Sequence, residues 1–400
     1  MVTPSEDQVT VVNVRHLSRL KELRFDFGRV PQVDIVLVFS GDPEEFPNYF
    51  PGLTVLLVDI DVGQRKFVPF LGSILKRNLR LAGYLAEVVN KAGARLVISN
   101  QDNLLELFRV KPLLRTAELV LIQNGTRSLR TDLADVVANS RDNLSVSSYL
   151  GFNEAQASWM GELFRGDYTA IGSFRSNHVA RVGSPQNLIS YISTFNPEVS
   201  KHHKVVSRDG RAVTYGDILD YRLNTLRMIQ NLSADVGCAL RILGKRFGTD
   251  ANAEYGFYRE NLRSDSFEFI SKRDRYANYS LCDESRLVVS TSSTLGFESL
   301  GRGNRTLLLN EDASRLGDTS LSFGWPESLP QSGPFWLSSI TKKEVVQRFS
   351  YLWTRDENDW RHDLAPYRRF LPMHDPGNSL FCEKLKHFGA QSPLRPSSDT

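Results

Sequence analysis

The chain has 400 residues, which is too many for one hydrophobic core of ordinary size and favours two domains. Its apolar fraction of 41%, charged fraction of 24% and net charge of +3 are those of a soluble globular protein. This balance permits anionic ligands and calls for no nucleic-acid partner, and three widely spaced cysteines disfavour a disulfide framework or a structural zinc site.

The N-terminal residues are polar and acidic, which predicts no secretory signal. No apolar run approaches the roughly 20 residues that cross a bilayer. Together with the cysteine usage, these features favour a reducing cytoplasm.

The first half of the chain alternates short apolar runs with amphipathic stretches. Residues 34–39 and 53–60 have the length and β-branched content of strands, and residues 70–92 carry apolar side chains at helical spacing up to Gly93. A further strand, a helix from Leu104 to Leu114 and a strand before Gln123 follow. Continuous apolar strands between helices predict a parallel sheet covered on both faces.

Polar clusters follow several of these strands, where parallel α/β sheets bind their ligands. The clusters are Asn100–Asn103, Gln123–Arg127 and Gly172–Asn177.

After a polar stretch at 178–188 the strand and helix pattern restarts and continues to residue 345. We therefore predict an α/β protein of two tandem doubly wound, Rossmann-like domains that face a cleft. The expected boundaries are 1–180 and 188–345, followed by a helical segment at 346–390 that packs back across both domains and a disordered tail at 391–400.

Residues 287–310 form the most informative segment. A short strand ends in a run of hydroxyl residues, a helix over 295–300 follows, and a second strand covers 306–309. Hydroxyls and backbone N–H groups at a helix N-terminus form a phosphate site, because the first-turn amides lack partners within the helix. The alternative is a buried βαβ unit whose Ser and Thr residues only cap the helix.

The sequence STSSTLGFESLGRG at 290–303 resembles the donor-site segment of GT-B glycosyltransferases that build bacterial surface polysaccharide and lipopolysaccharide. The stretches ALRILGK at 239–245 and IQNGTRS at 122–128 are similar to the same group. This resemblance implies a GT-B fold and a glycosyltransferase that moves a sugar from a nucleotide-activated donor to a surface glycan or lipid-linked glycan acceptor. It further implies no cofactor and no metal. The basic and aromatic stretch at 360–389 favours a helix that packs across both domains, and its alternative role is peripheral contact with the cytoplasmic face of the inner membrane.

Roles for individual residues follow from the resemblance and from their places at strand ends. The donor phosphate is expected at Ser292, Ser293, Thr294, Arg241 and Lys245, and the donor ribose at Glu298. The acceptor is expected at Gln123, Asn124, Arg127 and Arg175. Asp102 is the preferred general base over Asp42 and Asp61, with a helix N-cap as its alternative role.

Three alternatives remain open. A CDP-polyol phosphotransferase or a CMP-sugar transferase shares the fold, although the His-Gly and His-Pro elements typical of such enzymes are absent from the sequence. A non-catalytic partner that binds nucleotide or glycan within an assembly complex is the third.

Overall fold

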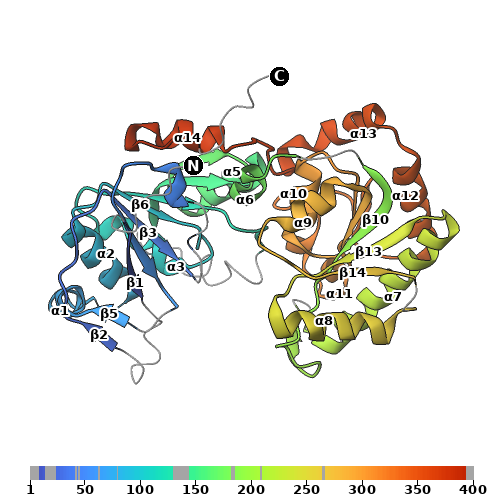
Figure 1. Ribbon diagram of the computed structural model, residues 1–400, viewed down its shortest axis with the longest axis horizontal. Coiled ribbons are helices and arrows are strands. Elements are labelled where there is room, and N and C mark those ends of the chain that lie inside the picture. The colour runs from blue at the N-terminus through green and yellow to red at the C-terminus, as the bar shows by residue number, and fades with distance from the viewer. Residues whose placement is uncertain are drawn as a thin grey trace. The chain divides into compact units, whose positions relative to one another are not determined.

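The computed structural model describes residues 9–13, 24–40, 43, 46–61, 64–78, 80–128, 144–181, 185–207, 210–263 and 266–392 (Figure 1). The chain divides into two units. The first contains residues 1–174 and 377–400, and the second contains residues 175–376.

The first unit is built on a sheet of seven parallel strands in the order β1-β4-β3-β6-β7-β8-β9. These strands are β1 (Val9–Asn13), β3 (Ile35–Phe39), β4 (Val55–Asp59), β6 (Leu96–Ser99), β7 (Glu118–Ile122), β8 (Ser145–Gly151) and β9 (Arg165–Ala170). A separate parallel pair joins β2 (Arg24–Asp26) to β5 (Gln64–Lys66). The helices are α1 (Phe67–Leu75), α2 (Leu81–Ala92), α3 (Leu105–Phe108), α5 (Glu154–Leu163) and α14 (Ser379–Leu385); α6 (Phe174–His178) begins at the last residue before the division.

Both faces of this first sheet are buried, as the apolar runs predict. Alternate residues of β3 point to opposite faces: Val36 and Val38 join a core with α2, whereas Ile35 and Leu37 join a core with α14. The C-terminal helix α14 therefore completes the core of the first unit.

The second unit contains a six-stranded parallel sheet in the order β14-β13-β10-β15-β16-β17. Its strands are β10 (Gln186–Ile192), β13 (Ala239–Leu243), β14 (Glu268–Ile270), β15 (Ser285–Ser290), β16 (Thr306–Leu309) and β17 (Trp336–Leu337), and β11 (Lys204–Val206) pairs with β12 (Ala212–Thr214) as a hairpin. The helices are α7 (Tyr215–Asp235), α8 (Gly248–Asn261), α9 (Ala277–Asp283), α10 (Thr294–Gly301), α11 (Glu311–Arg315), α12 (Lys342–Thr354) and α13 (Glu357–Leu364). Figure 1 shows α9 and α10 beside one face of this sheet and α7 and α8 beside the other.

The predicted fold class, two doubly wound α/β domains, is confirmed. The division of the chain differs in detail from the expected boundaries. The predicted linker at 178–188 belongs to the second unit, and the predicted segment at 346–390 is shared, with α12 and α13 in the second unit and α14 in the first. The expected tail at 391–400 lies outside the described residues apart from 391 and 392.

Two predicted helices of the first unit are wrong in extent. The helix expected over 70–92 is broken into α1 and α2, because Arg77 has a φ of 54° and this left-handed conformation ends α1. The helix expected from Leu104 to Leu114 is only α3 followed by a 3-10 turn at Lys111–Leu113. Pro112 explains the interruption, since its ring clashes with the carbonyl four residues earlier in an α-helix.

Among the helices that the structure describes, none combines the length and the apolar composition that a bilayer-spanning segment requires.

Candidate functional site in the second unit

The strand order of the second sheet indicates where a ligand would bind. Numbered by their order in the chain, the strands run 3-2-1-4-5-6, the order of nucleotide-binding Rossmann domains. The first and fourth of these, β10 and β15, are neighbours, and the connections that follow them leave in opposite directions. The residues just after them, Ser193–Thr194 and Thr291–Ser292, therefore lie at the topological switch point. The hydroxyl oxygens of Thr194 and Thr291 are 3.4 Å apart there.

Arg222 brings a largely buried positive charge to this switch point from the middle of α7. Its Nη1 donates to Thr194 Oγ1 at 3.1 Å, and its Nη2 donates to Ser292 Oγ at 2.7 Å. The same guanidinium forms an ion pair with Asp312 of α11, and the Arg222 side chain is only 11% exposed. Arg222 thus joins the loops after β10, β15 and β16.

Arg222 keeps its positive charge in this setting. Burial opposes its charged form, but the Asp312 carboxylate and the Tyr221 hydroxyl outweigh burial and raise the pKa of Arg222 above its ordinary value. Its Nε is buried and makes no hydrogen bond within the described residues. A guanidinium that is always charged and well ordered suits the binding of phosphate oxygens.

The N-terminus of α10 lies beside this guanidinium, because Ser292, which accepts from Arg222, directly precedes the N-cap residue of the helix. Ser293 is the N-cap, its side chain makes no capping hydrogen bond, and its own amide donates to Ser290 Oγ at 3.3 Å. Thr294 is the first helical residue. Ser292, Ser293 and Thr294 therefore lie where the sequence placed them, and their contact with a donor phosphate remains a prediction.

Gly296 fixes how closely α10 approaches its strand. A Cβ at this position would lie 2.4 Å from both Cβ and Oγ of Ser290, so only glycine fits. Close packing of a glycine-bearing helix against the preceding strand is a feature of Rossmann phosphate sites.

Glu298, the expected ribose ligand, lies on α10 and is buried. The Tyr279 hydroxyl of α9 donates to its Oε1 at 3.0 Å. This contact fixes the carboxylate, whose binding to ribose remains a prediction.

A second buried carboxylate, Glu254 of α8, holds the loop after β13. It accepts hydrogen bonds from the amides of Lys245 (3.0 Å) and Arg246 (3.0 Å) and from the Ser193 hydroxyl. Gly244 permits this approach, because a Cβ there would be 3.3 Å from Glu254 Oε2 and 2.9 Å from the Phe269 ring. Glu254 thus ties the loop after β13 to the loop after β10.

Lys245 adds positive charge near the switch point. Burial lowers the pKa of Lys245, and repulsion from Arg246 and Arg222 lowers it further. Three cationic side chains therefore interact at this edge of the second sheet, and an anionic ligand would relieve their mutual repulsion.

The expected position of Arg241 is wrong. Arg241 is the central residue of β13, and its guanidinium pairs with Glu268 at 3.1 Å and Glu284 at 3.3 Å. Glu268 begins β14 and Glu284 directly precedes β15, so Arg241 is held toward the amino-terminal ends of the strands. Arg222, rather than Arg241, brings a guanidinium to the carboxyl ends of these strands.

Polar residues of the first unit

Three of the residues predicted in the first unit come together at the carboxyl edge of its sheet. Asp102 follows β6, and Asn124 and Arg127 follow β7. The Asn124 amide donates to Asp102 Oδ1 at 3.1 Å, Arg127 Nε donates to Asp102 Oδ2 at 2.7 Å, and a second guanidinium nitrogen of Arg127 reaches Oδ1. The Tyr149 hydroxyl also donates to Oδ2, at 2.8 Å.

These contacts argue against Asp102 as the general base. The Asp102 side chain is 0% exposed, and both oxygens already accept hydrogen bonds, so neither is offered to an acceptor hydroxyl. Arg127, expected to clamp an anionic group, is likewise committed to Asp102. The pair instead shapes the loop that carries Asn124.

The other predicted residues occupy different settings. Gln123 is buried and accepts from the Phe152 amide at 2.8 Å while its side-chain amide donates to the Gly125 carbonyl, which supports the same loop. Arg175 belongs to the second unit, not the first, and repels Lys272 there. Asp61 accepts from the Ser40 hydroxyl, and Asp42 lies outside the described residues.

Among the described residues, no group of three or more His, Cys, Asp or Glu side chains is placed to hold a metal ion.

Arg222, Asp312 and Thr194 were missed in the sequence. A signal for Arg222 was present: it lies four residues from the buried Ile218 and four from the buried Leu226, so it places a charge on the apolar stripe of α7.

The two Rossmann-like domains define a GT-B fold. A family model described as "putative O-antigen biosynthesis protein" matches residues 120–388, and the chain belongs to that family. No curated protein matches the chain in sequence.

Solved structures share the architecture. MnaA of S. aureus, determined with UDP, is 12% identical with a TM-score of 0.51 and covers 92% of this chain and 100% of its own. The UDP-GlcNAc 2-epimerase of Neisseria meningitidis, bound to UDP-GlcNAc, is 11% identical with a TM-score of 0.50 and covers 88% and 100%. The wall teichoic acid polymerase TagF is 14% identical with a TM-score of 0.49 and covers 88% of each chain. At these identities, the likeness to MnaA and to the Neisseria meningitidis epimerase shows the fold alone.

Proposed function

We propose that this protein is a glycosyltransferase that moves a sugar from a nucleotide-activated donor to a surface-glycan precursor such as an O-antigen, capsule or lipopolysaccharide intermediate. The observation that carries the proposal is the position of Arg222, a buried guanidinium that contacts Thr194 and Ser292 at the switch point beside the N-terminus of α10. Membership of an O-antigen biosynthesis family supports the biological role.

In the proposed reaction, the bond between the sugar and the nucleotide phosphate breaks, the acceptor hydroxyl oxygen forms a new bond to the same sugar carbon, and the hydroxyl proton passes to the departing phosphate or to solvent. The developing charge on the departing phosphate is stabilised by Arg222, by the first-turn amides of α10 and by the nearby Lys245 and Arg246. Glu298 binds the donor ribose as a hydrogen-bond acceptor. The loop of Asn124 contacts the acceptor, with Asp102 and Arg127 fixing its shape. We further propose that the transfer needs no metal and takes place on the cytoplasmic side of the inner membrane.

Nucleotide binding tests the proposal directly. Thermal unfolding is followed with CMP, CDP, UDP, GDP and TDP, each with and without magnesium. A ligand at a hundredfold excess over its Kd stabilises the folded state by about 2.7 kcal/mol, which is easily seen. One nucleotide should raise the unfolding temperature of the wild type, independently of magnesium, and should lose this effect in Arg222→Gln.

Arg227→Gln is the matched control, because Arg227 lies on the same helix, is exposed, and donates to the Asn261 carbonyl away from the switch point. A shift that survives in Arg222→Gln would contradict the proposed site. Release of the same nucleotide from its sugar conjugate, in the presence of an extracted glycan acceptor, would then establish transfer.

The alternatives give different results in the same experiment. A CDP-polyol phosphotransferase would release CMP, and a CMP-sugar transferase would respond to CMP but not to CDP. A non-catalytic partner would bind a nucleotide or glycan without turnover under any of these conditions.

A further inference from the structure

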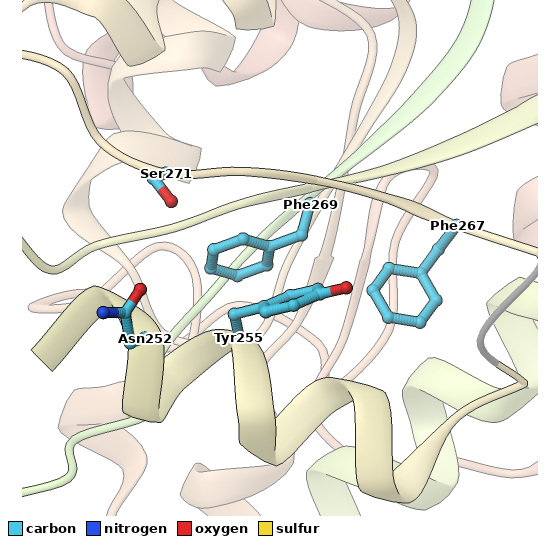
Figure 2. A pocket seen from close by; sticks show the side chains of 5 residues that line it. All are labelled: Asn252, Tyr255, Phe267, Phe269 and Ser271. Carbon is cyan, nitrogen blue, oxygen red and sulfur yellow. The ribbon is translucent and has the colours of Figure 1, made fainter. Parts of the chain in front are cut away.

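A pocket of about 300 Å³ lies between α8 and β14 of the second unit, outside the contacts made at the switch point. Its lining consists of Asn252, Tyr255, Phe267, Phe269 and Ser271 (Figure 2). The volume is at the lower end of the range for small-molecule sites.

The local structure explains why these side chains share one space. Phe267, Phe269 and Ser271 alternate along the extended segment that contains β14, so they point to the same face of the sheet. Asn252 and Tyr255 are three residues apart on α8 and therefore lie on the same helix face. Figure 2 shows the Tyr255 ring facing Phe269 and pointing its hydroxyl toward Phe267, with Asn252 and Ser271 at one end.

The polar groups of the pocket are available to a ligand. Among the described residues, no hydrogen bond is made to the side chain of Asn252, Tyr255 or Ser271. All three residues are exposed, and Tyr255 is 41% exposed. The neighbouring Glu254 points the other way, toward the loops of the switch point. The pocket is therefore distinct from the hydrogen-bond network of the proposed donor site.

The chemistry of the lining selects the kind of ligand. None of the five lining residues carries a charge. The Arg259 guanidinium lies 5.6 Å from the Tyr255 ring centroid, so a cation stands beside the pocket without lining it. The uncharged lining favours a neutral ligand over a phosphate or carboxylate. The Tyr255 and Phe269 ring centroids are 5.4 Å apart, less than the roughly 7 Å needed for a flat ring at carbon contact distances on both sides. A planar base therefore cannot insert between these two rings.

A monosaccharide is a ligand that is neither charged nor planar. The C–H face of a sugar ring packs against the exposed aromatic surface, while hydroxyls around its edge bond to an amide and two hydroxyl groups. We propose that the pocket between α8 and β14 binds a neutral sugar unit of a glycan. This site goes beyond the proposed transfer reaction, and it holds whether or not the protein is catalytic.

Ligand-observed saturation-transfer NMR on the full-length protein tests the site. The probes are the methyl glycosides of glucose, galactose, mannose, N-acetylglucosamine, rhamnose and fucose, with uridine and cytidine as planar competitors. At least one glycoside should bind the wild type. Its binding should weaken about tenfold, or about 1.4 kcal/mol, in Tyr255→Ala and in Asn252→Ala. Tyr255→Phe, which keeps the ring and loses the hydroxyl, should give an intermediate loss and serves if Tyr255→Ala does not fold.

Phe27→Ala is the control, because Phe27 is a 73% exposed aromatic residue of the first unit. It should bind the glycoside as the wild type does, and the nucleotide shift of the preceding section should persist in Tyr255→Ala. The inference is overturned if no glycoside binds the wild type, or if a glycoside binds the Tyr255 variants as well as the wild type. It is also overturned if loss of Tyr255 weakens the binding of the nucleosides only. A missing nucleotide shift with intact glycoside binding would instead count against the proposed transferase alone.

Discussion

Arg222 Nη2 and Ser292 Oγ are joined by a 2.7 Å hydrogen bond that connects the middle of α7 to the turn before α10. Because Arg222 also pairs with Asp312, one guanidinium fixes the turn that carries the candidate phosphate-binding residues. An incoming phosphate would meet a cation that is already in place, and preorganisation of this kind lowers the cost of binding.

Removing Arg222 should therefore affect both stability and nucleotide binding, and a double variant separates the two effects. Arg222→Gln leaves the Asp312 carboxylate buried without its cation and should lower the free energy of unfolding by about 3–5 kcal/mol. Arg222→Gln combined with Asp312→Asn should recover much of this stability. It should not recover the nucleotide affinity, which we expect to remain 10- to 100-fold below the wild type because a charge-assisted hydrogen bond is lost. Denaturant unfolding and calorimetric titration measure the two quantities, and recovered affinity in the double variant would show that Arg222 acts only on the fold.

Glu254→Gln should weaken nucleotide binding without a direct ligand contact. The Gln side chain keeps one acceptor oxygen. Either the position that accepts from the Lys245 and Arg246 amides or the position that accepts from the Ser193 hydroxyl therefore becomes an N–H donor, and the lost contact costs about 1–3 kcal/mol. The displaced loop should raise the Kd for the nucleotide more than it changes the binding of a glycoside. Glu260→Gln, an exposed change on the same helix, is the control and should leave both quantities as they are.

The sequence predicted the elements whose signal is local. The strand at 306–309 is β16 in full, and Gly93 ends α2 with a φ of 64°. The turn of Ser292–Thr294 was predicted for the same reason, since hydroxyls between a strand and a helix form a local pattern.

The parts that the sequence did not predict depend on contacts between distant residues. Arg222 reaches Asp312 across 90 residues, and nothing in the local pattern of α7 names that partner. Asp102 was expected to be a base because it follows an apolar strand. Its partner Arg127 lies 25 residues later in the chain and donates hydrogen bonds to the carboxylate. Arg241 was assigned by closeness to a strand end, whereas it is the central residue of β13 and pairs with Glu268 at the start of β14.

Gly296→Ala should disrupt the helix that carries Glu298. The added Cβ would lie 2.4 Å from Ser290, so α10 must shift, and overpacking of this kind costs about 1–3 kcal/mol. Gly256→Ala on α8 is the opposite control: no atom lies within 4 Å of its Cβ, and a helical alanine should stabilise by about 1 kcal/mol. The unfolding temperature should fall in Gly296→Ala and rise in Gly256→Ala. A change of the same sign in both variants would contradict the packing described for α10.

Asp102→Asn distinguishes a base from a residue that supports a loop. If Asp102 fixes the Asn124 loop, the variant should lose about 3–5 kcal/mol of stability, because Arg127 remains buried with a neutral partner. Transfer, measured where the variant is fully folded, should fall mainly through a higher KM for the acceptor. A large fall in kcat at unchanged stability would restore Asp102 as the base.

His374 should make the stability of the second unit depend on pH. Burial, aided by repulsion from Arg302, lowers the pKa of His374 from 6.5 to about 4. The unfolded chain therefore takes up a proton near pH 6.5 that the folded protein accepts only near pH 4. Stability should fall as the pH drops through this window, by about 1–3 kcal/mol, and His374 should add no slope above it.

The measurement is the free energy of unfolding at several pH values for the wild type, His374→Gln and His202→Gln. His374→Gln should flatten the slope between pH 6.5 and 4, while the exposed His202 serves as the control. An unchanged slope in His374→Gln would assign the pH dependence to other groups.

The placement of α14 in the first unit has a consequence for how the protein is made. The core of that unit needs Phe381 and Leu385 of α14, and Asn378 donates to the Phe174 carbonyl at 3.0 Å, so the two points where the chain leaves and rejoins the unit are adjacent. The second unit is thus an uninterrupted insertion within the first. On the ribosome, residues 175–376 emerge as a complete folding unit while the N-terminal sheet still lacks part of its cover. The half that is synthesised first must therefore complete its core last, and until then one apolar face of its sheet lacks the cover of α14.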